Sequence, residues 1–216
     1  MNFKLRTDLF PSVETIIFDL GGVLLNIDYY LTQNAFEQLG VLHFDQAYSQ
    51  AKQSSLFDDL ETGKLNPDQF RDEARRILVP GLSNKQIDSA WNAMLLDLPA
   101  IRVQLLKNIR NKYRTFLLSN TNKIHYDAYT KYLEQAHGFV DFAELMEKQY
   151  LSFQIGLRKP NADCFQLILD ENKLNPNTTL FIDDSIQHVE GAKAVGLQAY
   201  HLNVLNGEKV EDLFLT

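Results

Sequence analysis

The clearest pattern in the chain is a series of short apolar runs that each end in polar or glycine residues. There are four: TIIFD (15–19), RTFLLSN (114–120), TLFIDD (179–184) and QAYHLN (198–203). Unbroken apolar runs are typical of strands that are covered on both faces, whereas half-exposed strands alternate between apolar and polar residues. The four runs therefore predict buried parallel strands.

Amphipathic helical patterns separate these predicted strands. The segment NADCFQLILDENKL (161–174) carries its large apolar residues on one face, and Pro160 precedes it at a position that suits the first residue of a helix. The segment SIQHVEGAKAVGL (185–197) has the same period, with Gly196 as a helix stop signal. Alternating strands and helices predict an α/β fold with a doubly wound parallel sheet.

The stretch 28–98 differs, because it contains helical patterns and no convincing strand. Its amphipathic segments are YLTQNAFEQLG (30–40), NPDQFRDEARRIL (66–78) and NKQIDSAWNAMLL (84–96). Their apolar stripes are more typical of packing faces than of a cofactor-binding site. We therefore predict an all-helical domain over residues 28–98, inserted into a core domain that comprises residues 1–27 and 99–216.

Composition and charge limit the classes of partner that the protein can bind. The 216 residues carry a formal net charge of -7 and form no basic stripe, which argues against nucleic acid as a partner. A phosphorylated substrate would therefore need a local cation or a metal. The single Cys164 cannot form an internal disulfide, and no apolar run is long enough to span a membrane, so we expect a soluble cytoplasmic protein. Monomer and homodimer both remain open.

Candidate chemistry lies where the predicted strands end. The residues are Asp19, Ser119 and Asn120, and the pair Asp183–Asp184, with Lys159 before a predicted helix. Each has an ordinary alternative role: a turn cap, a helix cap or a solvated surface lysine. The acidic pair is harder to explain in this way, because adjacent carboxylates repel each other and a helix N-cap accounts for only one of them. In open α/β sheets, ligands bind outside the carboxyl ends of the strands.

The order of these motifs resembles the haloacid dehalogenase superfamily of phosphotransferases and hydrolases. The four matching motifs are FDLGGVL (18–24), LLSNTN (117–122), RKP (158–160) and FIDDSIQHVEGA (181–192). The helical insertion falls where that superfamily has its helical cap. The resemblance implies a Rossmann-like core and is greatest to a subgroup that includes sugar-1-phosphate phosphatases and the N-terminal domains of epoxide hydrolases.

The resemblance implies a metal-assisted nucleophile. Asp19 would attack phosphorus and form an aspartyl-phosphate that water later hydrolyses. Mg²⁺ would be held by Asp19, the backbone carbonyl of Gly21, and one or both of Asp183 and Asp184, which are hard oxygen ligands of the kind it prefers.

The resemblance also implies how a substrate would be held. Ser119, the backbone of Asn120 and Lys159 would bind the phosphate oxygens, and Lys159 would keep Asp19 ionised. The partner would then be a small phosphorylated metabolite, such as a sugar phosphate.

Gly21 departs from the pattern, because most phosphatases of the superfamily carry there a second Asp as general acid and base. Such catalysis contributes about 10²–10⁴-fold, so its absence weakens a phosphatase without abolishing it. We therefore expect substrates with an acidic leaving hydroxyl, such as a sugar 1-phosphate. Asp28, His188 and His125 are candidates for a replacement proton shuttle, as is solvent, although Asp28 also suits a helix N-cap.

Two other functions compete with a phosphatase. One is a metal-independent 2-haloacid dehalogenase, which would not be expected to keep Asp183 and Asp184. The other is a non-catalytic phosphometabolite-binding protein, for which Gly21 is the only support. Substrate choice should depend on the helical cap, where the turn LFDDLETGKL (56–65) offers Phe57 and Glu61.

Overall fold

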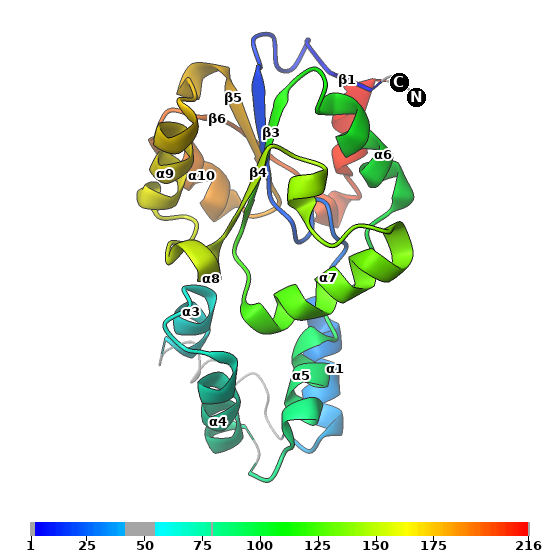
Figure 1. Cartoon of the computed structure of the whole chain (residues 1–216), viewed down its shortest axis with the longest axis vertical. Coiled ribbons are helices and arrows are strands. Elements are labelled where there is room, and N and C mark those ends of the chain that lie inside the picture. Colours follow the sequence, from blue (N-terminus) through cyan, green and yellow to red (C-terminus); the bar gives the residue numbers. More distant parts are fainter. Residues whose placement is uncertain (1–2, 42–54, 79, 216) are drawn as a thin grey trace.

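The computed structural model describes residues 3–41, 55–78 and 80–215 and contains a five-stranded sheet in the order β4-β3-β2-β5-β6, with all strands parallel (Figure 1). The strands are β2 (Thr15–Phe18), β3 (Arg114–Ser119), β4 (Lys148–Leu151), β5 (Thr179–Asp183) and β6 (Gln198–His201). The α/β prediction with a doubly wound parallel sheet is confirmed, and all four predicted strands are present.

The sequence prediction missed β4, and the reason is its place in the sheet. β4 is an edge strand that pairs only with β3, and its first two residues are exposed or half-buried. It therefore lacks an unbroken apolar run. A further two-stranded antiparallel pair, β1 (Lys4–Leu5) with β7 (Phe214–Leu215), joins the two ends of the chain and is too short to give a pattern.

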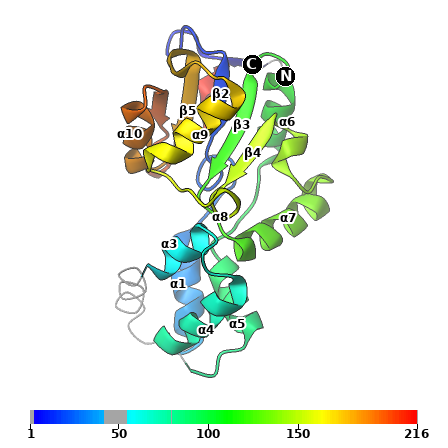
Figure 2. The same cartoon turned by 60° about the vertical axis from the view of Figure 1, so that its left-hand side comes forward.

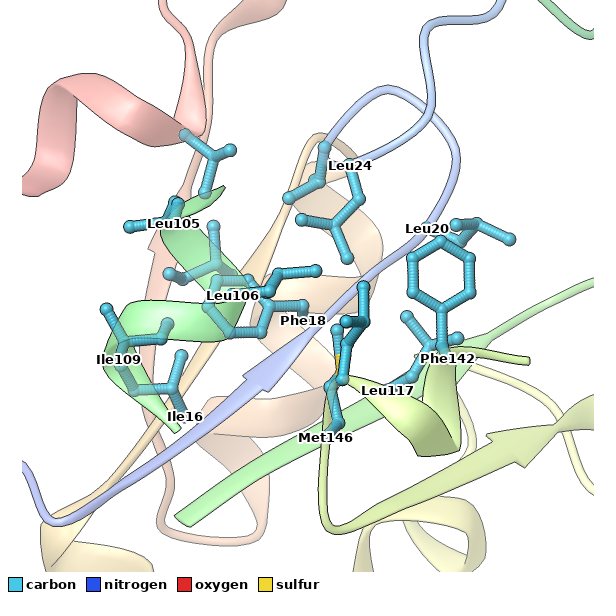
Figure 3. Packing of buried hydrophobic residues seen from close by; sticks show 14 of the residues in the cluster. Ile16, Phe18, Leu20, Leu24, Leu105, Leu106, Ile109, Leu117, Phe142 and Met146 are labelled. Atoms are coloured by element: carbon cyan, nitrogen blue, oxygen red, sulfur yellow. The ribbon is translucent and has the colours of Figure 1, made fainter. Parts of the chain in front are cut away.

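Helices cover both faces of the sheet, as the predicted buried strands require. Ile16 and Phe18 of β2 pack on the side of α6 (Ala100–Ile109), together with Leu105, Leu106 and Ile109 (Figure 3). Ile17, between them, packs in the cluster on the opposite face. The helices on that face are α9 (Ala162–Asn172) and α10 (Ile186–Ala194).

The remaining elements of the core are α7 (Lys123–His137), α8 (Ser152–Ile155) and four short 3₁₀ helices, at Phe142–Glu144, Pro176–Thr178, Val204–Asn206 and Val210–Leu213. α10 ends as predicted, because Gly196 has a φ of 89° just after its C-cap. The prediction for Pro160 is wrong. α9 begins at Ala162, and the Lys159 backbone, bonded to the side chain of Asn120, holds Pro160 in the turn before the helix.

The insertion is helical, as predicted, and packs around its own apolar cluster. The helices among its described residues are α1 (Tyr29–Gln38), α3 (Leu56–Glu61), α4 (Pro67–Ile77) and α5 (Asn84–Asn92). They form the narrower end of the molecule in Figures 1 and 2, beside the carboxyl ends of the core strands. Phe36, Phe70 and Trp91 are buried between them, and no described residue of 28–98 forms a strand.

Local sequence explains where three of these helices begin. Asp28, Asn66 and Ser83 each accept a backbone N–H at the first turn of α1, α4 and α5. In α4 and α5, the Gln at the third helical position also accepts a hydrogen bond from the backbone N–H of the N-cap residue. The exact division at residues 28 and 98 stays a prediction, and residues 42–54 of the insertion lie outside the described residues. In the part of the chain that the structure describes, no helix combines the length and apolar character that crossing a membrane requires.

Candidate active site

A cleft of about 590 Å³ lies between the carboxyl ends of the sheet strands and the helical cap. The registers of β2 with β3 and β5 place Phe18 beside Leu117 and Ile182, so the residues that follow these strands converge. The predicted residues that line the cleft are Asp19, Gly21, Ser119, Asn120, Lys159 and Asp184. Asp183 is fully buried behind them.

Lys159 is the central cation of this group and is not a surface lysine. Its side chain is 0% exposed, and its Nζ lies 2.5 Å from Asp19 Oδ1 and 2.7 Å from Asp183 Oδ2. Burial alone would lower the pKa of Lys159, but the two carboxylates outweigh burial and raise it. The ammonium therefore stays charged beside Asp19.

Three carboxylates share this one cation. Oxygen atoms of Asp19, Asp183 and Asp184 all lie within 4.8 Å of one another. Burial raises the pKa of Asp19 despite Lys159, and burial together with Asp183 raises the pKa of Asp184. For Asp183, burial is outweighed by Lys159 and His188, which bring its pKa to about 2. Three carboxylates around one ammonium group carry more negative charge than it can offset, and the raised pKa values of Asp19 and Asp184 show that Lys159 alone does not keep Asp19 ionised, contrary to what the resemblance implies.

A divalent cation fits this excess. Hard carboxylate oxygens clustered at a strand end are ligands that Mg²⁺ prefers. The backbone leaves room for them, because a Cβ on Gly22 would lie 2.2 Å from Asp184 Oδ2, and Gly22 has a φ of 79°. Only glycine allows the Asp184 carboxylate to lie against this turn. We call Asp19, Asp183, Asp184 and Lys159 the cleft floor.

Ser119 and Asn120 reach the cleft at the end of β3, and neither caps a helix. The cap of α7 is Asn122, whose side chain accepts from the backbone N–H groups of Ile124 and His125. Asn120 instead accepts from the Lys159 backbone N–H at 2.9 Å and donates to its carbonyl at 3.0 Å. Asn120 thus positions the segment that carries Lys159, a role that the sequence did not indicate.

The three candidates for a proton shuttle lie in different environments. Asp28 caps α1 by accepting from Tyr30 N and does not line the cleft. His125 lines it, but burial lowers its pKa to about 3, so its imidazole is neutral and a weak base near pH 7. His188 lines the cleft and contacts Asp183 through Nδ1 at 3.0 Å. His125 is bonded to the Asn92 side chain, so His188 is the one of the three candidates that both lines the cleft and contacts a carboxylate.

The cap closes the opposite side of the cleft. Glu61 of α3 lines the cleft and lies 3.0 Å from Arg158 of the core. The ring of Phe57 stacks on Trp91 and that of Trp91 on His125, each with 5.2 Å between centroids. We call Phe57, Glu61 and Trp91 the cap wall. Sequence reasoning missed Arg158, although it stands inside the RKP motif and its charge matches the acidic run LFDDLE.

A second cavity of about 320 Å³ adjoins the first on the cap side. Its lining includes Phe57 and Trp91, and it shares Glu61, Asn120 and His125 with the cleft. The arrangement joins a charged floor to an outer space with aromatic walls. Such a site can hold an anion at the floor and a larger uncharged group toward the cap.

Comparison with known proteins gives consistent results. The sequence model of the haloacid dehalogenase-like hydrolases matches residues 13–196. A D-ribitol-5-phosphate phosphatase of Bacteroides thetaiotaomicron is 27% identical over 190 residues, which cover 87% of this chain and 91% of the relative.

Solved structures are also similar. A HAD family enzyme of Bacteroides thetaiotaomicron, in complex with magnesium and inorganic phosphate, has a TM-score of 0.80 and 33% identity over 88% of this chain and 93% of its own. A HAD-like hydrolase from Porphyromonas gingivalis has a TM-score of 0.78 and 31% identity over 88% and 91%. A dehalogenase, at 18% identity and a TM-score of 0.59, shares the fold.

Proposed function

The chain belongs to the haloacid dehalogenase-like hydrolase family, and we propose that it is a Mg²⁺-dependent phosphatase acting on a small sugar or polyol phosphate. The observation that carries this proposal is the cleft floor. Asp19 lies at the end of the central strand with Lys159 at 2.5 Å, and two more carboxylates lie within 4.8 Å. The relative named as a phosphatase and the neighbour with bound magnesium and phosphate support it.

In the proposed mechanism Asp19 is the nucleophile. Its carboxylate oxygen forms a bond to phosphorus while the bond from phosphorus to the leaving oxygen breaks, and water then hydrolyses the aspartyl-phosphate. Ser119, the Asn120 backbone and Lys159 hold the other phosphate oxygens. Lys159 offsets the negative charge that gathers on the transferred group.

Four groups of this chain would hold Mg²⁺: Asp19, the backbone carbonyl of Gly21, Asp183 and Asp184. The ion would offset the excess charge of these carboxylates and that of the phosphate. Asp183 is already bonded to Lys159 and His188 and is fully buried, so its free capacity is smaller than that of Asp184. We therefore assign Asp184 as the more accessible of the two ligands.

The glycine at position 21 affects which leaving groups the enzyme would accept. A Cβ at this position would meet Ile27 Cδ1 at 3.1 Å, so an apolar side chain stands where a catalytic carboxylate would project. Without a general acid at this position, the leaving oxygen is poorly protonated, which favours substrates whose leaving hydroxyl is acidic, such as a sugar 1-phosphate. The named relative acts on D-ribitol 5-phosphate, an ester of a primary alcohol, which favours an ordinary polyol ester. His188 is our candidate to protonate such a leaving group.

The proposal is tested by a phosphate-release screen over sugar 1-phosphates, terminal sugar and polyol phosphates, and p-nitrophenyl phosphate, with and without Mg²⁺. We expect Mg²⁺-dependent release that favours a hydroxylated substrate and is lost in Asp19→Asn. Release of halide from 2-haloacids without Mg²⁺, or no turnover of any phosphate, would contradict the proposal. The likeness to a dehalogenase, at 18% identity, supports the shared fold alone.

A further inference from the structure

Two buried polar atoms at the edge of the cleft have no hydrogen-bond partner among the residues that the structure describes. One is Glu61 Oε2, an acceptor, and the other is Arg158 Nε, a donor. Both side chains line the cleft, and they belong to different parts of the molecule. Glu61 ends α3 of the cap, whereas Arg158 directly precedes Lys159 in the core.

Two adjacent buried polar atoms without hydrogen bonds are unusual. Most buried polar groups in proteins are bonded, and leaving one unbonded is costly, more so for charged groups. Glu61 Oε2 itself lies 3.0 Å from Arg158 Nη2, in an ion pair that keeps both side chains in place although the contact does not have hydrogen-bond geometry. The geometry nevertheless leaves one acceptor and one donor side by side at the cleft.

A hydroxyl group is the chemical group that matches this pair. It donates one hydrogen bond and accepts another, so one hydroxyl, or two neighbouring hydroxyls of one polyol, can serve both atoms. A second phosphate or carboxylate would instead meet the Glu61 charge in a cleft that already contains Asp19 and Asp184. An apolar group would leave both atoms unbonded.

The position of Glu61 also suits this role. Glu61 lines both the cleft and the outer cavity, so it lies where a substrate passes from one to the other. With its phosphate at the cleft floor, a substrate would extend its leaving group past Glu61 toward Phe57 and Trp91. The leaving group is therefore the part of the substrate that Glu61 contacts.

We propose that Glu61, held by Arg158, is a specificity-determining residue that binds the hydroxyl groups of an uncharged sugar or polyol leaving group. This inference rests on the proposed phosphatase function. It assigns Glu61 a role in binding the leaving group, with no part in the bond changes at phosphorus.

The test compares Glu61→Gln with a matched control, Asp58→Asn. Asp58 lies on the same helix and pairs with the same Arg158, but it is exposed and lines neither cavity. Each variant replaces one carboxylate by its amide. The probes are D-ribitol 5-phosphate, D-ribulose 1,5-bisphosphate and p-nitrophenyl phosphate, which lacks hydroxyl groups.

For Glu61→Gln we expect KM for D-ribitol 5-phosphate to rise about tenfold with little change in kcat, because a charge-assisted bond is lost. Kinetics with p-nitrophenyl phosphate should change less than about twofold, and the preference for ribitol 5-phosphate over the bisphosphate should shrink. Asp58→Asn should leave all three substrates unchanged.

Three results would overturn the inference while leaving the proposed function intact. KM could rise equally for all substrates, Asp58→Asn could reproduce the effect, or kcat for ribitol 5-phosphate could fall at unchanged KM, which would assign Glu61 to proton transfer. If the wild-type protein hydrolyses none of the three probes with Mg²⁺, the proposed function fails and this inference fails with it.

Discussion

The cleft floor and the cap wall differ in how completely their polar groups are bonded. On the floor, Lys159 binds Asp19 and Asp183, and His188 also contacts Asp183, so these side chains hold one another in place beside Asp184. On the cap wall, Glu61 Oε2 lies in an ion pair with Arg158 at 3.0 Å but receives no hydrogen bond from any described residue, and the other surfaces are aromatic rings.

This difference indicates a division of tasks. A preorganised charged floor is suited to a reaction in which charge develops at fixed positions. A wall with open polar atoms and flat rings is suited to binding a variable group, since a ligand supplies the missing bonds. Variants of the two regions should therefore affect chemistry and selectivity separately.

The largest expected effect is on turnover, from Asp19→Asn. Without the nucleophilic carboxylate, kcat for p-nitrophenyl phosphate should fall by at least about 10³-fold. The control is Asp28→Asn at the mouth of the cap, because Asn caps a helix as well as Asp does and this residue does not line the cleft. Activity of the control within about twofold of wild type with D-ribitol 5-phosphate, whose alkoxide leaving group needs a proton, excludes Asp28 as proton shuttle. An active Asp19→Asn protein would contradict the assignment of the chemical step to the cleft floor.

The next largest effect is on stability, from Lys159→Met. The substitution leaves Asp19 and Asp183 buried without their cation, so the free energy of unfolding should fall by about 3–5 kcal/mol in urea titrations without Mg²⁺. Lys193→Met, which breaks an exposed pair with Glu190, should cost no more than about 0.5 kcal/mol. Equal losses in the two variants would show that the floor charges are not tightly coupled.

Substitutions of the two adjacent glycines should change the affinity for Mg²⁺ to different extents. In Gly22→Ala, the Cβ would meet the Asp184 carboxylate at 2.2 Å and the φ of 79° disfavours alanine, so the Kd for Mg²⁺ should rise about 10–100-fold in calorimetric titration. Gly21→Ala meets only the end of the Ile27 side chain, at 3.1 Å, and should change the Kd less than about threefold. The opposite order would mean that Asp184 does not hold the ion.

The smallest effect is a pH-dependent loss of stability where the cap wall meets the core. His125 is buried against Trp91 with its pKa lowered to about 3, so the unfolded chain binds a proton that the folded protein does not, from pH 6.5 down to about pH 3. Between pH 7 and pH 5 the wild type should therefore lose about 2 kcal/mol more than His125→Phe, which keeps a ring against Trp91. Parallel pH curves in urea unfolding would show that His125 is not buried as a neutral group.

The sequence predicted those parts of the fold that depend on local pattern. The buried central strands have unbroken apolar runs and could be found, whereas the edge strand β4 has no such run and the β1–β7 pair is too short. The helix caps Asp28 and Gly196 follow from local chemistry, and both are present.

The candidate site could be predicted only as a set of strand-end residues. Asp19, Ser119 and Asp184 meet in the cleft because parallel strands place their ends together, and Lys159 reaches them from the turn before α9. The Arg158–Glu61 contact joins residues that are far apart in sequence, and the role of Asn120 depends on the turn before α9. Contacts of this kind come from tertiary packing, which no local pattern encodes.

The most direct test of the central claim is a crystal structure of the protein with magnesium and beryllium fluoride, which mimics a phosphoryl group bonded to a carboxylate. The account predicts a tetrahedral beryllium fluoride group attached to an oxygen of Asp19, with Lys159 on one of its fluorines and Mg²⁺ between Asp19 and Asp184. A beryllium fluoride group bound elsewhere, or an Asp19 side chain that points away from an occupied cleft, would contradict it.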